Sequence, residues 1–458
     1  MLRIALVLFV AWLGGSPAHA ATFKVNSLLD TSDGTCAATP GGCTLREAIE
    51  ASVATPGRDG IVFDPAVFPP AGFTGLIGIT SPLPPMSDPA GTVVDGAGAT
   101  VQINGGGQPH GLLFSTAAGV AIEKVTVANV LVLNVNGAAI EVCGGAPPAC
   151  DDGVTGVLIQ NVVVAGATQG IAVRGGVVAK VRVAGAVASN GAGGIFIGGS
   201  EALVGARVEG SSAPTIYLFG DALVSGATVV DSLASGGSTG VMVQSTQRVT
   251  GAKVADVVTF STIDSGVRVV ADGTTAGTKI TNVVASTYGV DGVEVYGDGG
   301  NSGVAVKRVR ADQGGDGVAV FGPLDGGKFQ DLVLIDDVVG LDLSDPRGAT
   351  NTKVTDVIAV DNAQGVLVVG GGTKLKNVHA AANAGAGIVI SGTGGNVVEK
   401  SRASANNQIG IGTDSQANGI RKNVALGNDP DLADDHPTCD ANAWQKNVFV
   451  TSSAPCIH

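Results

Sequence analysis

The sequence predicts an all-β fold, a parallel β-solenoid, from a repeat and from the content of each repeat unit. A short apolar alternation recurs through residues 171–410, nearly always directly after a glycine. Its copies begin at Ile171, Ile195, Ile216, Val241, Val267, Val293, Val318, Leu341, Val366 and Ile388, so each unit is 21 to 26 residues long. Further alternating runs in each unit are separated by Gly, Ser and Asn, which leaves no room for a helix. Such a unit cannot bury its own apolar face, whereas stacked copies form one continuous core.

The composition agrees with tight turns around a thin core. The 458 residues include 71 glycines and only 4% aromatic residues. Glycine enters left-handed turn conformations freely, and the alternating Val and Ile suit a pleated surface. The net charge of −13 argues against a nucleic-acid partner, because phosphate binding requires a basic surface. A solvated acidic surface is one interpretation of this charge, and cation binding is the other.

Residues 1–20 are predicted to be a cleavable secretory signal. Arg3 precedes an apolar run over residues 4–13, and Ala18-His19-Ala20 has the small-residue pattern of a cleavage site. The run is too short to span a bilayer, and no later stretch is long and apolar enough. We therefore expect an exported monomer, secreted, periplasmic or on the cell surface, with no membrane span.

The cysteines fit an exported protein because they fall in three local pairs. Six cysteines allow fifteen connectivities, and proximity in the sequence favours the local one. Zinc binding is the alternative, with little support because no Cys-x-x-Cys pair or nearby histidine pair occurs. The predicted disulfides join Cys36 to Cys43, Cys143 to Cys150 and Cys439 to Cys456.

The N-terminal segment is predicted to cap the solenoid. Residues 22–26 indicate a strand, and residues 43–49 indicate the start of a helix, in which Thr44 and Glu47 have the spacing of a capping box. A single amphipathic helix ahead of a solenoid is expected to cover the open end of the first coil. Its apolar face consists of Leu45, Ala48, Ile49 and Val53.

The run Cys43-Thr-Leu-Arg-Glu-Ala-Ile49 resembles the N-terminal signature of bacterial CSLREA-type proteins, with Thr44 in place of the usual serine. Ile61-Val-Phe-Asp-Pro65 and Val93-Val-Asp-Gly-Ala-Gly98 are similar to segments that follow that signature, so the resemblance covers roughly residues 22–104. The later repeats are similar to those of right-handed parallel β-helix proteins of the pectate-lyase-like superfamily. This resemblance implies a right-handed coil of three strands per turn and export, and implies little about activity.

We divide the chain into a signal peptide (1–20), an N-terminal cap of strand plus helix (21–60), a parallel β-helix (61–427) and a disulfide-stapled C-terminal cap (428–458). In that last cap, Trp444 and Phe449 are expected to pack over the final coil. Its acids Asp429, Asp431, Asp434 and Asp435 are expected to be solvated, with calcium binding as the alternative.

Asparagines recur at similar places near the ends of the later units. Stacked in adjacent coils, they are predicted to form a ladder of amide hydrogen bonds from coil to coil, which is a structural role. These residues are Asn362, Asn383, Asn406 and Asn428.

One surface is a candidate for binding. Within each repeat strand the apolar residues are expected to face the core, so the residues between them face solvent. Five of the scarce aromatics fall on these positions. We call the set the outward stripe: Phe196, Tyr217, Phe219, Met242, Gln244, Arg268, Glu294, Tyr296, Phe321, Asp342 and Ser344.

The outward stripe predicts a groove for a sugar polymer, because aromatic rings stack on sugar faces and charged groups bind hydroxyls or uronates. In the alternative, long loops cover the stripe, or Arg268 and Glu294 form a surface ion pair of little consequence. The expected ligand-binding residues are Phe196, Tyr217, Phe219, Arg268, Glu294, Tyr296 and Phe321.

Two functions follow: a non-catalytic glycan-binding or scaffold protein, which we favour, and a lyase or glycoside hydrolase acting on an acidic polysaccharide. In a lyase, Arg268 would be the base or would neutralise a uronate, and Glu294, Asp298 and Asp342 could hold calcium; no other cofactor is expected. In a hydrolase, Glu294 and Asp342 would be the two carboxylates, two coils or roughly 10 Å apart, near the upper limit for inversion.

The compact acidic calcium cluster and the arginine context of pectate lyases have no match in the sequence, which favours the binding protein. Convergence of Arg268, Glu294 and Asp342 in an open cleft would favour the enzyme.

Overall fold

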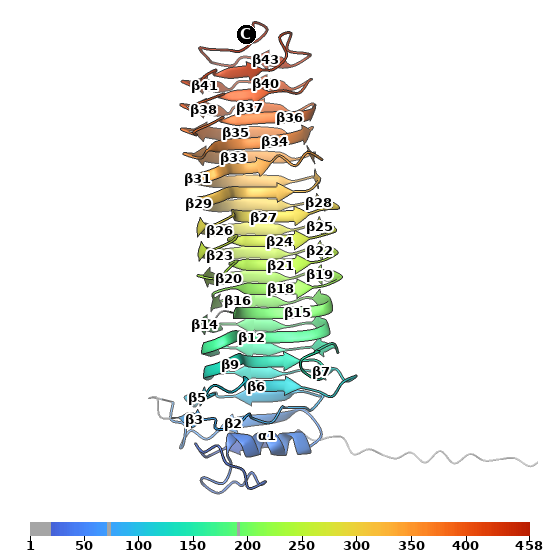
Figure 1. The fold of residues 1–458 in the computed structure, drawn as a ribbon, viewed down its shortest axis with the longest axis vertical. Coiled ribbons are helices and arrows are strands. Elements are labelled where there is room, and N and C mark those ends of the chain that lie inside the picture. The colour runs from blue at the N-terminus through green and yellow to red at the C-terminus, as the bar shows by residue number, and fades with distance from the viewer. Residues whose placement is uncertain (1–19, 71–74, 190–192) are drawn as a thin grey trace, which may run out of the picture.

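The computed structural model describes residues 20–70, 75–189 and 193–458, so the predicted signal peptide lies almost wholly outside the described residues. The chain forms a parallel β-solenoid of about 15 turns with one short helix, which confirms the predicted solenoid. Figure 1 shows the turns stacked along one axis, with the helix at the N-terminal end. Over these described ranges, no helix has the length and hydrophobicity needed to cross a membrane.

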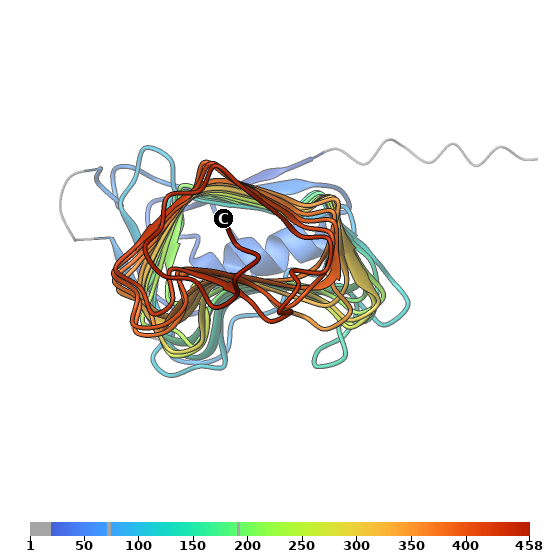
Figure 2. The same cartoon turned by 90° about the horizontal axis from the view of Figure 1, so that it is seen from above.

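A representative turn has three strands, and Figure 2 shows successive turns superposed along the axis. The turn starts with β24 (Val267–Ala271), continues with the short β25 (Thr274–Ala276) and ends with β26 (Lys279–Tyr288). Val267, Val269 and their equivalents are fully buried, so the apolar alternation fills the interior as predicted. Each strand pairs in parallel with its counterpart one turn later, which is β27 (Asp291–Gly297), β28 (Gly300–Ser302) or β29 (Ala305–Phe321).

The strands form rows along the axis, and long strands take part in two rows. The row that carries the outward stripe contains β6 (His110–Ser115), β9 (Val130–Cys143), β12 (Val163–Ala179), β15 (Gly193–Val204), β18 (Ile216–Gly220), β21 (Val241–Ser245), β24, β27, β29, β31 (Lys328–Leu343), β34 (Gln364–Gly371), β36 (Ile388–Gly394), β39 (Ile411–Thr413) and β42 (Leu432–Asp434). The second row adds β7 (Ile122–Glu123), β10 (Val154–Thr155), β19 (Leu223–Ser225), β22 (Arg248–Thr250), β25, β28, β30 (Leu324–Asp325) and β32 (Ala349–Thr350).

The remaining strands close the coil opposite the stripe. One row contains β1 (Thr22–Val25), β2 (Asp59–Phe63), β4 (Thr92–Asp95), β8 (Thr126–Ala128), β11 (Leu158–Gln160), β13 (Arg182–Ala184), β16 (Arg207–Glu209), β20 (Thr228–Ser235), β23 (Lys253–Thr262), β26, the first parts of β29 and β31, β33 (Lys353–Val360), β35 (Lys374–Ala381), β37 (Val397–Glu399), β40 (Gly419–Arg421) and β43 (Ala443–Gln445). The last row adds β3 (Leu76–Gly78), β5 (Val101–Asn104), β14 (Val187–Ser189), β17 (Ser212–Ala213), β38 (Arg402–Ser404) and β41 (Val424–Leu426).

Left-handed residues at five-residue intervals form the corners that close each coil. In one turn these are Gly277, Asn282 and Thr287, with φ of 64°, 54° and 54°. A side chain makes this conformation costly, and Asn, Asp and Gly tolerate it best. The same three corners recur in neighbouring turns, for example at Gly303, Arg308, Gln313 and at Gly326, Asp331, Asp336. This period was not predicted from the sequence, because Gly, Asn or Asp occupies many of the corners but Thr287, Arg308 and Gln313 occupy others.

The glycine that precedes each repeat strand is required by the close approach of adjacent turns. A Cβ atom at Gly266 would lie 2.7 Å from the carbonyl oxygen of Gly292, and a Cβ at Gly340 would lie 2.7 Å from that of Gly365. Carbon and oxygen do not approach this closely without a shift of the backbone. The Gly-apolar-x-apolar signature therefore records the stacking distance between coils.

The helix α1 (Leu45–Ala54) lies across the N-terminal end of the solenoid, as Figures 1 and 2 show. The predicted capping box is present: Glu47 Oε2 accepts from the Thr44 N–H at 2.8 Å, and Thr44 Oγ1 accepts from the Glu47 N–H at 3.2 Å. Placing Val53 on the buried face was wrong, because it is 40% exposed and Ser52 is buried instead. The other three predicted face residues, Leu45, Ala48 and Ile49, are buried.

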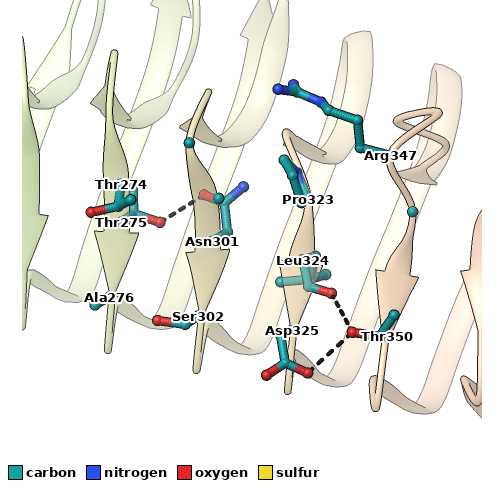
Figure 3. Close-up of a pocket in the computed structure, with 13 residues that line it drawn as sticks. Thr274, Thr275, Ala276, Asn301, Ser302, Pro323, Leu324, Asp325, Arg347 and Thr350 are labelled. Atoms are coloured by element: carbon teal, nitrogen blue, oxygen red, sulfur yellow. Dashed lines mark hydrogen bonds between the residues drawn. The ribbon is translucent and has the colours of Figure 1, made fainter.

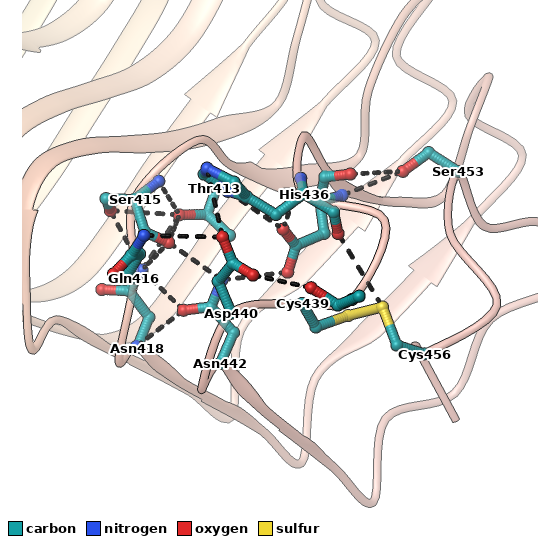
Figure 4. A network of polar contacts seen from close by, with 12 residues as sticks. Thr413, Ser415, Gln416, Asn418, His436, Cys439, Asp440, Asn442, Ser453 and Cys456 are labelled. Carbon is teal, nitrogen blue, oxygen red and sulfur yellow. Dashed lines mark hydrogen bonds and ion pairs between the residues drawn. A yellow bond between two sulfur atoms is a disulfide. The ribbon is translucent and has the colours of Figure 1, made fainter.

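The three predicted disulfides are present. They join Cys36 to Cys43, Cys143 to Cys150 and Cys439 to Cys456, with sequence separations of 7, 7 and 17 residues. The last one closes the C-terminal segment drawn in Figure 4.

Parallel pairing continues past residue 427, because β42 pairs with β39 and β43 pairs with β40. Trp444 is buried and donates from Nε1 to Asp434 Oδ2 at 2.9 Å, and Phe449 packs partly buried against the core. Asp431 Oδ2 accepts from the N–H groups of Val450 and Thr451, at 2.9 and 3.2 Å. The expectation that the acids of this segment are solvated was therefore wrong for Asp431 and Asp434, which are buried and bond the last turns, whereas Asp429 and Asp435 are exposed.

The predicted asparagine ladder is confirmed. The Nδ2 of each asparagine donates to the Oδ1 of the next. These distances are 3.1 Å from Asn362 to Asn383, 2.7 Å from Asn383 to Asn406 and 2.8 Å from Asn406 to Asn428. The last amide donates to Asp431 Oδ1 at 3.0 Å. All four asparagines are buried, so the ladder satisfies polar groups inside one corner of the stack.

Candidate functional site

Strand register aligns the outward stripe in two columns on one face. The first column, read turn by turn, is Phe196, Tyr217, Met242, Arg268, Glu294, Ala319 and Asp342. The second is Gly198, Phe219, Gln244, Val270, Tyr296 and Phe321. Neighbours in a column are about 4.8 Å apart along the axis.

The N-terminal part of the stripe is an aromatic patch of Phe196, Tyr217 and Phe219. The ring centroids of Phe196 and Tyr217 are 5.4 Å apart and nearly perpendicular, and those of Tyr217 and Phe219 are 6.0 Å apart. The Tyr217 hydroxyl donates to Gln244 Oε1 at 2.6 Å, and burial raises the pKa of Tyr217. A cavity of about 200 Å³ opens beside Phe196 and Tyr217.

A charged cluster beyond this patch was not found from the sequence. Glu141 precedes Phe196 in the first column by two turns, with Ala172 between them. Its carboxylate lies 2.8 Å from His110 Nδ1 and 3.3 Å from Arg174 Nη1, and the Arg174 guanidinium carbon lies 5.6 Å from the Phe196 ring centroid. The repeat register, extended two units toward the N-terminus, is the signal that identifies Glu141.

The C-terminal part of the stripe contains a cavity of about 380 Å³, which we call the carboxylate pocket. Arg268 lies inside it between two acids, with Nε 2.7 Å from Glu294 Oε2 and Nη1 3.3 Å from Asp264 Oδ2. Its lining consists of Asp264, Arg268, Gly289, Val290, Asp291, Glu294, Gly315, Asp316, Phe321 and Val338. Glu294 is only 4% exposed, so the expectation that it points freely to solvent was wrong: its carboxylate is buried against Arg268 and accepts from Ser265 Oγ at 3.3 Å.

Burial changes the protonation of this pocket. It raises the pKa of Asp291 to about 7, and the charges of Glu294 and Asp316 act in the same direction. It raises the pKa of Asp316 to about 6, with a further contribution from Asp342. Burial also raises the pKa of Glu294, although the adjacent Arg268 opposes this shift. The pocket therefore gains and loses protons close to neutral pH.

Asp291 has an unmatched oxygen in this pocket. Its Oδ1 accepts from the Asp316 N–H at 3.3 Å. Its Oδ2 is buried and has no hydrogen-bond partner among the residues that the structure describes. A buried carboxylate oxygen without a donor is costly, so this atom is available to a bound group or to a proton.

The structure brings together Arg268, Glu294 and Phe321 and leaves the other candidates outside the pocket. Asp342 lies two turns from Glu294, beyond Ala319, and its Oδ1 accepts from the Ser344 N–H at 2.8 Å. Tyr296 precedes Phe321 in the second column.

Asp298, the remaining calcium candidate, lies outside the pocket in a different contact. Asp298 Oδ1 lies 2.8 Å from Arg347 Nη1. Asp298 follows Glu294 by four residues, a distance of about 13 Å along an extended chain. Within the described ranges, no group of three or more His, Cys, Asp or Glu side chains is arranged around a metal position.

A second groove of about 380 Å³ lies on the second row, across β25, β28, β30 and β32 (Figure 3). Thr275 Oγ1 donates to Asn301 Oδ1 at 2.6 Å, and Thr350 Oγ1 donates to Asp325 Oδ1 at 3.1 Å. Arg347 at its edge is held by Asp298 and Asp345. These polar groups bond one another from turn to turn, so the groove offers fewer free groups than the carboxylate pocket.

Comparison with known proteins gives one partial family match. Residues 329–453 match the family described as periplasmic copper-binding protein (NosD), a segment that covers less than half of the chain and contains only the C-terminal turns. No curated protein matches the sequence.

Several solved structures are similar to this chain at a low level. The periplasmic alginate epimerase AlgG is 9% identical, with 89% of each chain covered and a TM-score of 0.34. The A-module of the mannuronan C-5 epimerase AlgE6 from Azotobacter vinelandii is 9% identical, with 90% of this chain and 93% of that chain covered and a TM-score of 0.24. The catalytic unit of the GH87 α-1,3-glucanase from Streptomyces thermodiastaticus is 12% identical, with 96% and 71% covered and a TM-score of 0.31. Similarity at this level carries no argument about function.

Proposed function

We propose that this chain is an exported carbohydrate-binding β-helix protein whose outward stripe holds an extended glycan. The observation that carries the proposal is that the aromatic patch and three residues of the carboxylate pocket, Arg268, Glu294 and Phe321, occupy the same two columns of one face. Aromatic rings give apolar contact with sugar rings, and the polar groups of a pocket fix the orientation of a ligand. A linear polymer laid along the axis would meet both parts of the stripe.

Export is supported by independent features of the chain. Three disulfides are typical of an oxidising compartment. The predicted signal over residues 1–20 and the partial match to a periplasmic family agree with this compartment.

The test is affinity electrophoresis on a panel of plant, algal and bacterial polysaccharides. We expect at least one glycan to retard the protein, and we expect Tyr217→Ala to abolish the retardation. Phe260→Ala is the matched control, because Phe260 is an exposed aromatic on β23, outside the stripe. Equal binding by both variants, or no retardation by any glycan, would show that the stripe is not a glycan-binding face.

Glycoside hydrolysis is a second candidate, favoured by the position of Asp291. A general acid needs a pKa near the working pH, and burial raises the pKa of Asp291 to about 7. Arg268 and Glu294 converge in the open pocket, as the enzyme hypothesis required, whereas Asp342 lies outside its lining. A hydrolase would release reducing ends from a glycan that the protein binds, and Asp291→Asn would abolish that release. A lyase gains less support, because Arg268 is already neutralised by two carboxylates.

The copper binding named for the partly matching family was tested against the donors of the matched segment. Copper(I) sites use thiolate or thioether sulfur, and copper(II) sites use imidazole with further nitrogen or oxygen ligands around one point. Residues 329–453 contain two histidines, His379 on β35 and His436 after β42, and no methionine. The sulfur of Cys439 is in a disulfide, and the His436 nitrogens face Asp434 and Asp440 at 3.8 and 3.5 Å. These residues do not fit a copper site, and we propose no copper-dependent step.

A further inference from the structure

The carboxylate pocket carries more negative charge than its own cation can balance. Asp264, Asp291, Glu294 and Asp316 line it, and Arg268 is the one basic residue of the lining. Arg268 is paired with Asp264 and Glu294, so Asp291 and Asp316 face the cavity without a cation. A uronate carboxylate entering this space would meet like charges at short range in a half-buried environment, which is strongly unfavourable.

The buried atom Asp291 Oδ2 is the second, independent sign of a ligand. Asp291 is 3% exposed and lines the pocket, yet this oxygen has no donor among the described residues. An N–H or ammonium group on a ligand would supply the missing donor, and charge-assisted hydrogen bonds of this type are among the strongest in proteins.

The carboxylates are distributed along the axis. Asp264 precedes β24, Asp291 begins β27 and Asp316 is its register partner on β29, whereas Asp342 on β31 lies in the column of Glu294. Three consecutive turns therefore each present an acid to the pocket, with neighbouring turns about 4.8 Å apart. A single divalent cation needs several oxygens converging on one point. Such a group of three or more acids is absent from the part of the chain that the structure describes. The linear arrangement suits a linear ligand with repeated positive groups.

We propose that the carboxylate pocket selects glycans that carry free amino groups, in which a protonated amine on a sugar ring binds between Asp291 and Asp316. This inference rests on the proposed glycan-binding function and names its ligand class. Phe321 supplies an apolar contact at the same pocket, so one sugar residue meets a ring and two carboxylates together. The ligand class differs from the acidic polysaccharide considered from the sequence, because Arg268, the residue that suggested a uronate, is internally paired.

The selectivity is expected to depend on pH. Burial raises the pKa of Asp291 to about 7 and that of Asp316 to about 6. The negative charges of Glu294 and Asp264 further raise the pKa of Asp291, and that of Asp342 further raises the pKa of Asp316. Arg268 acts in the opposite direction on the pKa of Glu294. A protonated carboxyl attracts an ammonium group less strongly than a carboxylate does. Affinity for the protonated form of an aminoglycan should therefore rise as the pH increases from 5 to 7, the interval in which these two groups lose their protons.

The experiment measures binding of four oligosaccharides by isothermal titration calorimetry: a glucosamine hexamer, its fully N-acetylated form, an oligogalacturonate and a cello-oligomer. We expect the glucosamine hexamer to bind at least about tenfold more tightly than the N-acetylated form at pH 7, and less tightly at pH 5. Asp316→Asn should lose about tenfold in affinity. Asp414→Asn is the control for net charge, because Asp414 is exposed after β39, outside the pocket, and should leave the affinity unchanged.

Arg268→Gln separates this proposal from a uronate site. If the pocket binds amines, loss of the competing internal cation should strengthen binding of the glucosamine hexamer. If Arg268 binds a uronate, the same change should weaken binding of the oligogalacturonate. Tightest binding of the oligogalacturonate, or equal binding of the acetylated and free-amine hexamers, would overturn the amine selectivity and leave the binding face standing. Equal losses in Asp316→Asn and Asp414→Asn would show attraction to net charge alone and overturn the site. Absence of binding by every oligosaccharide would refute the proposed function itself.

Discussion

Replacing Asn406 by alanine tests whether the asparagine ladder holds adjacent turns together. The Asn406 side chain makes four hydrogen bonds: Oδ1 accepts from the N–H and Nδ2 of Asn383 at 3.1 and 2.7 Å, and Nδ2 donates to Ala380 O and Asn428 Oδ1 at 3.2 and 2.8 Å. All of these groups are buried, so water cannot replace the lost partner without an opening of the corner.

The magnitude follows from which groups stay unpaired in Asn406→Ala. The Asn383 N–H loses its side-chain acceptor, which costs about 1–3 kcal/mol for a buried donor. Asn383 Nδ2 still donates to Ala359 O, and Asn428 Oδ1 still accepts from the backbone N–H of residue 406, which limits the additional loss. We expect the free energy of unfolding to fall by about 2–4 kcal/mol in total.

The matched control is Asn407→Ala, one residue further along the same turn. The Asn407 side chain is exposed, and its backbone N–H donates to Asn383 O at 3.0 Å, a bond that alanine retains. Guanidinium denaturation followed by far-UV circular dichroism gives the stability of each variant. Hydrogen exchange then locates the effect, because a solenoid turn contacts only its neighbours and residues 374–390 should exchange faster while residues 216–245 do not. If the two variants differ by less than about 0.5 kcal/mol, the ladder does not stabilise the stack and the reasoning is refuted.

Three further predictions concern the ends of the solenoid and its repeat glycines. Burial disfavours the ionised Glu47 side chain, but hydrogen bonds from Thr44 and Asp33 outweigh it and lower its pKa. The stability that Glu47 gives α1 is therefore fully present above the ordinary carboxyl pKa and is lost as the pH falls through the lowered pKa of Glu47. In Glu47→Gln, the protection of α1 from hydrogen exchange should no longer depend on pH in this range. Cys439→Ser with Cys456→Ser opens a loop with a 17-residue separation, so the C-terminal turns should lose about 3 kcal/mol and unfold first in limited proteolysis. Gly340→Ala should lower the free energy of unfolding, measured by guanidinium denaturation, by about 1–3 kcal/mol, because its Cβ would lie 2.7 Å from Gly365 O. Gly78→Ala, with open space around the new Cβ, should leave it unchanged.

Local patterns predicted most of the architecture. The stacking of parallel turns followed from the Gly-apolar-x-apolar repeat, because its glycines record a backbone contact between neighbouring coils, as at Gly266 and Gly340. The capping box of Thr44 and Glu47 and the three local disulfides followed from spacing alone. Val53 was misplaced because helical periodicity gives a face only to within about one residue, and the packing of α1 against β1 and β2 selected Ser52.

The candidate site was predicted only in part. The repeat register placed Arg268, Glu294 and Phe321 on one face, since strand alternation fixes which side chains share a column. Asp264, Asp291 and Asp316 were missed because Asp264 precedes β24, Asp291 is the first residue of β27, and Asp316 follows the left-handed corner at Gln313 within β29. At such positions the alternation no longer tells which way a side chain points.

The sequence by itself determined that this chain stacks as a parallel solenoid, because the period, the glycines and the alternation are each local consequences of one repeated contact. It also determined the contents of the outward stripe. Only the tertiary structure decided the charge balance of the pocket, since that depends on which turn residues fold over the stripe and on how deeply they are buried. Burial and like charges raise the pKa of Asp291 and Asp316, and Asp264 and Glu294 neutralise Arg268. These are distance and solvation effects between residues on different turns, which the order of residues along the chain does not contain.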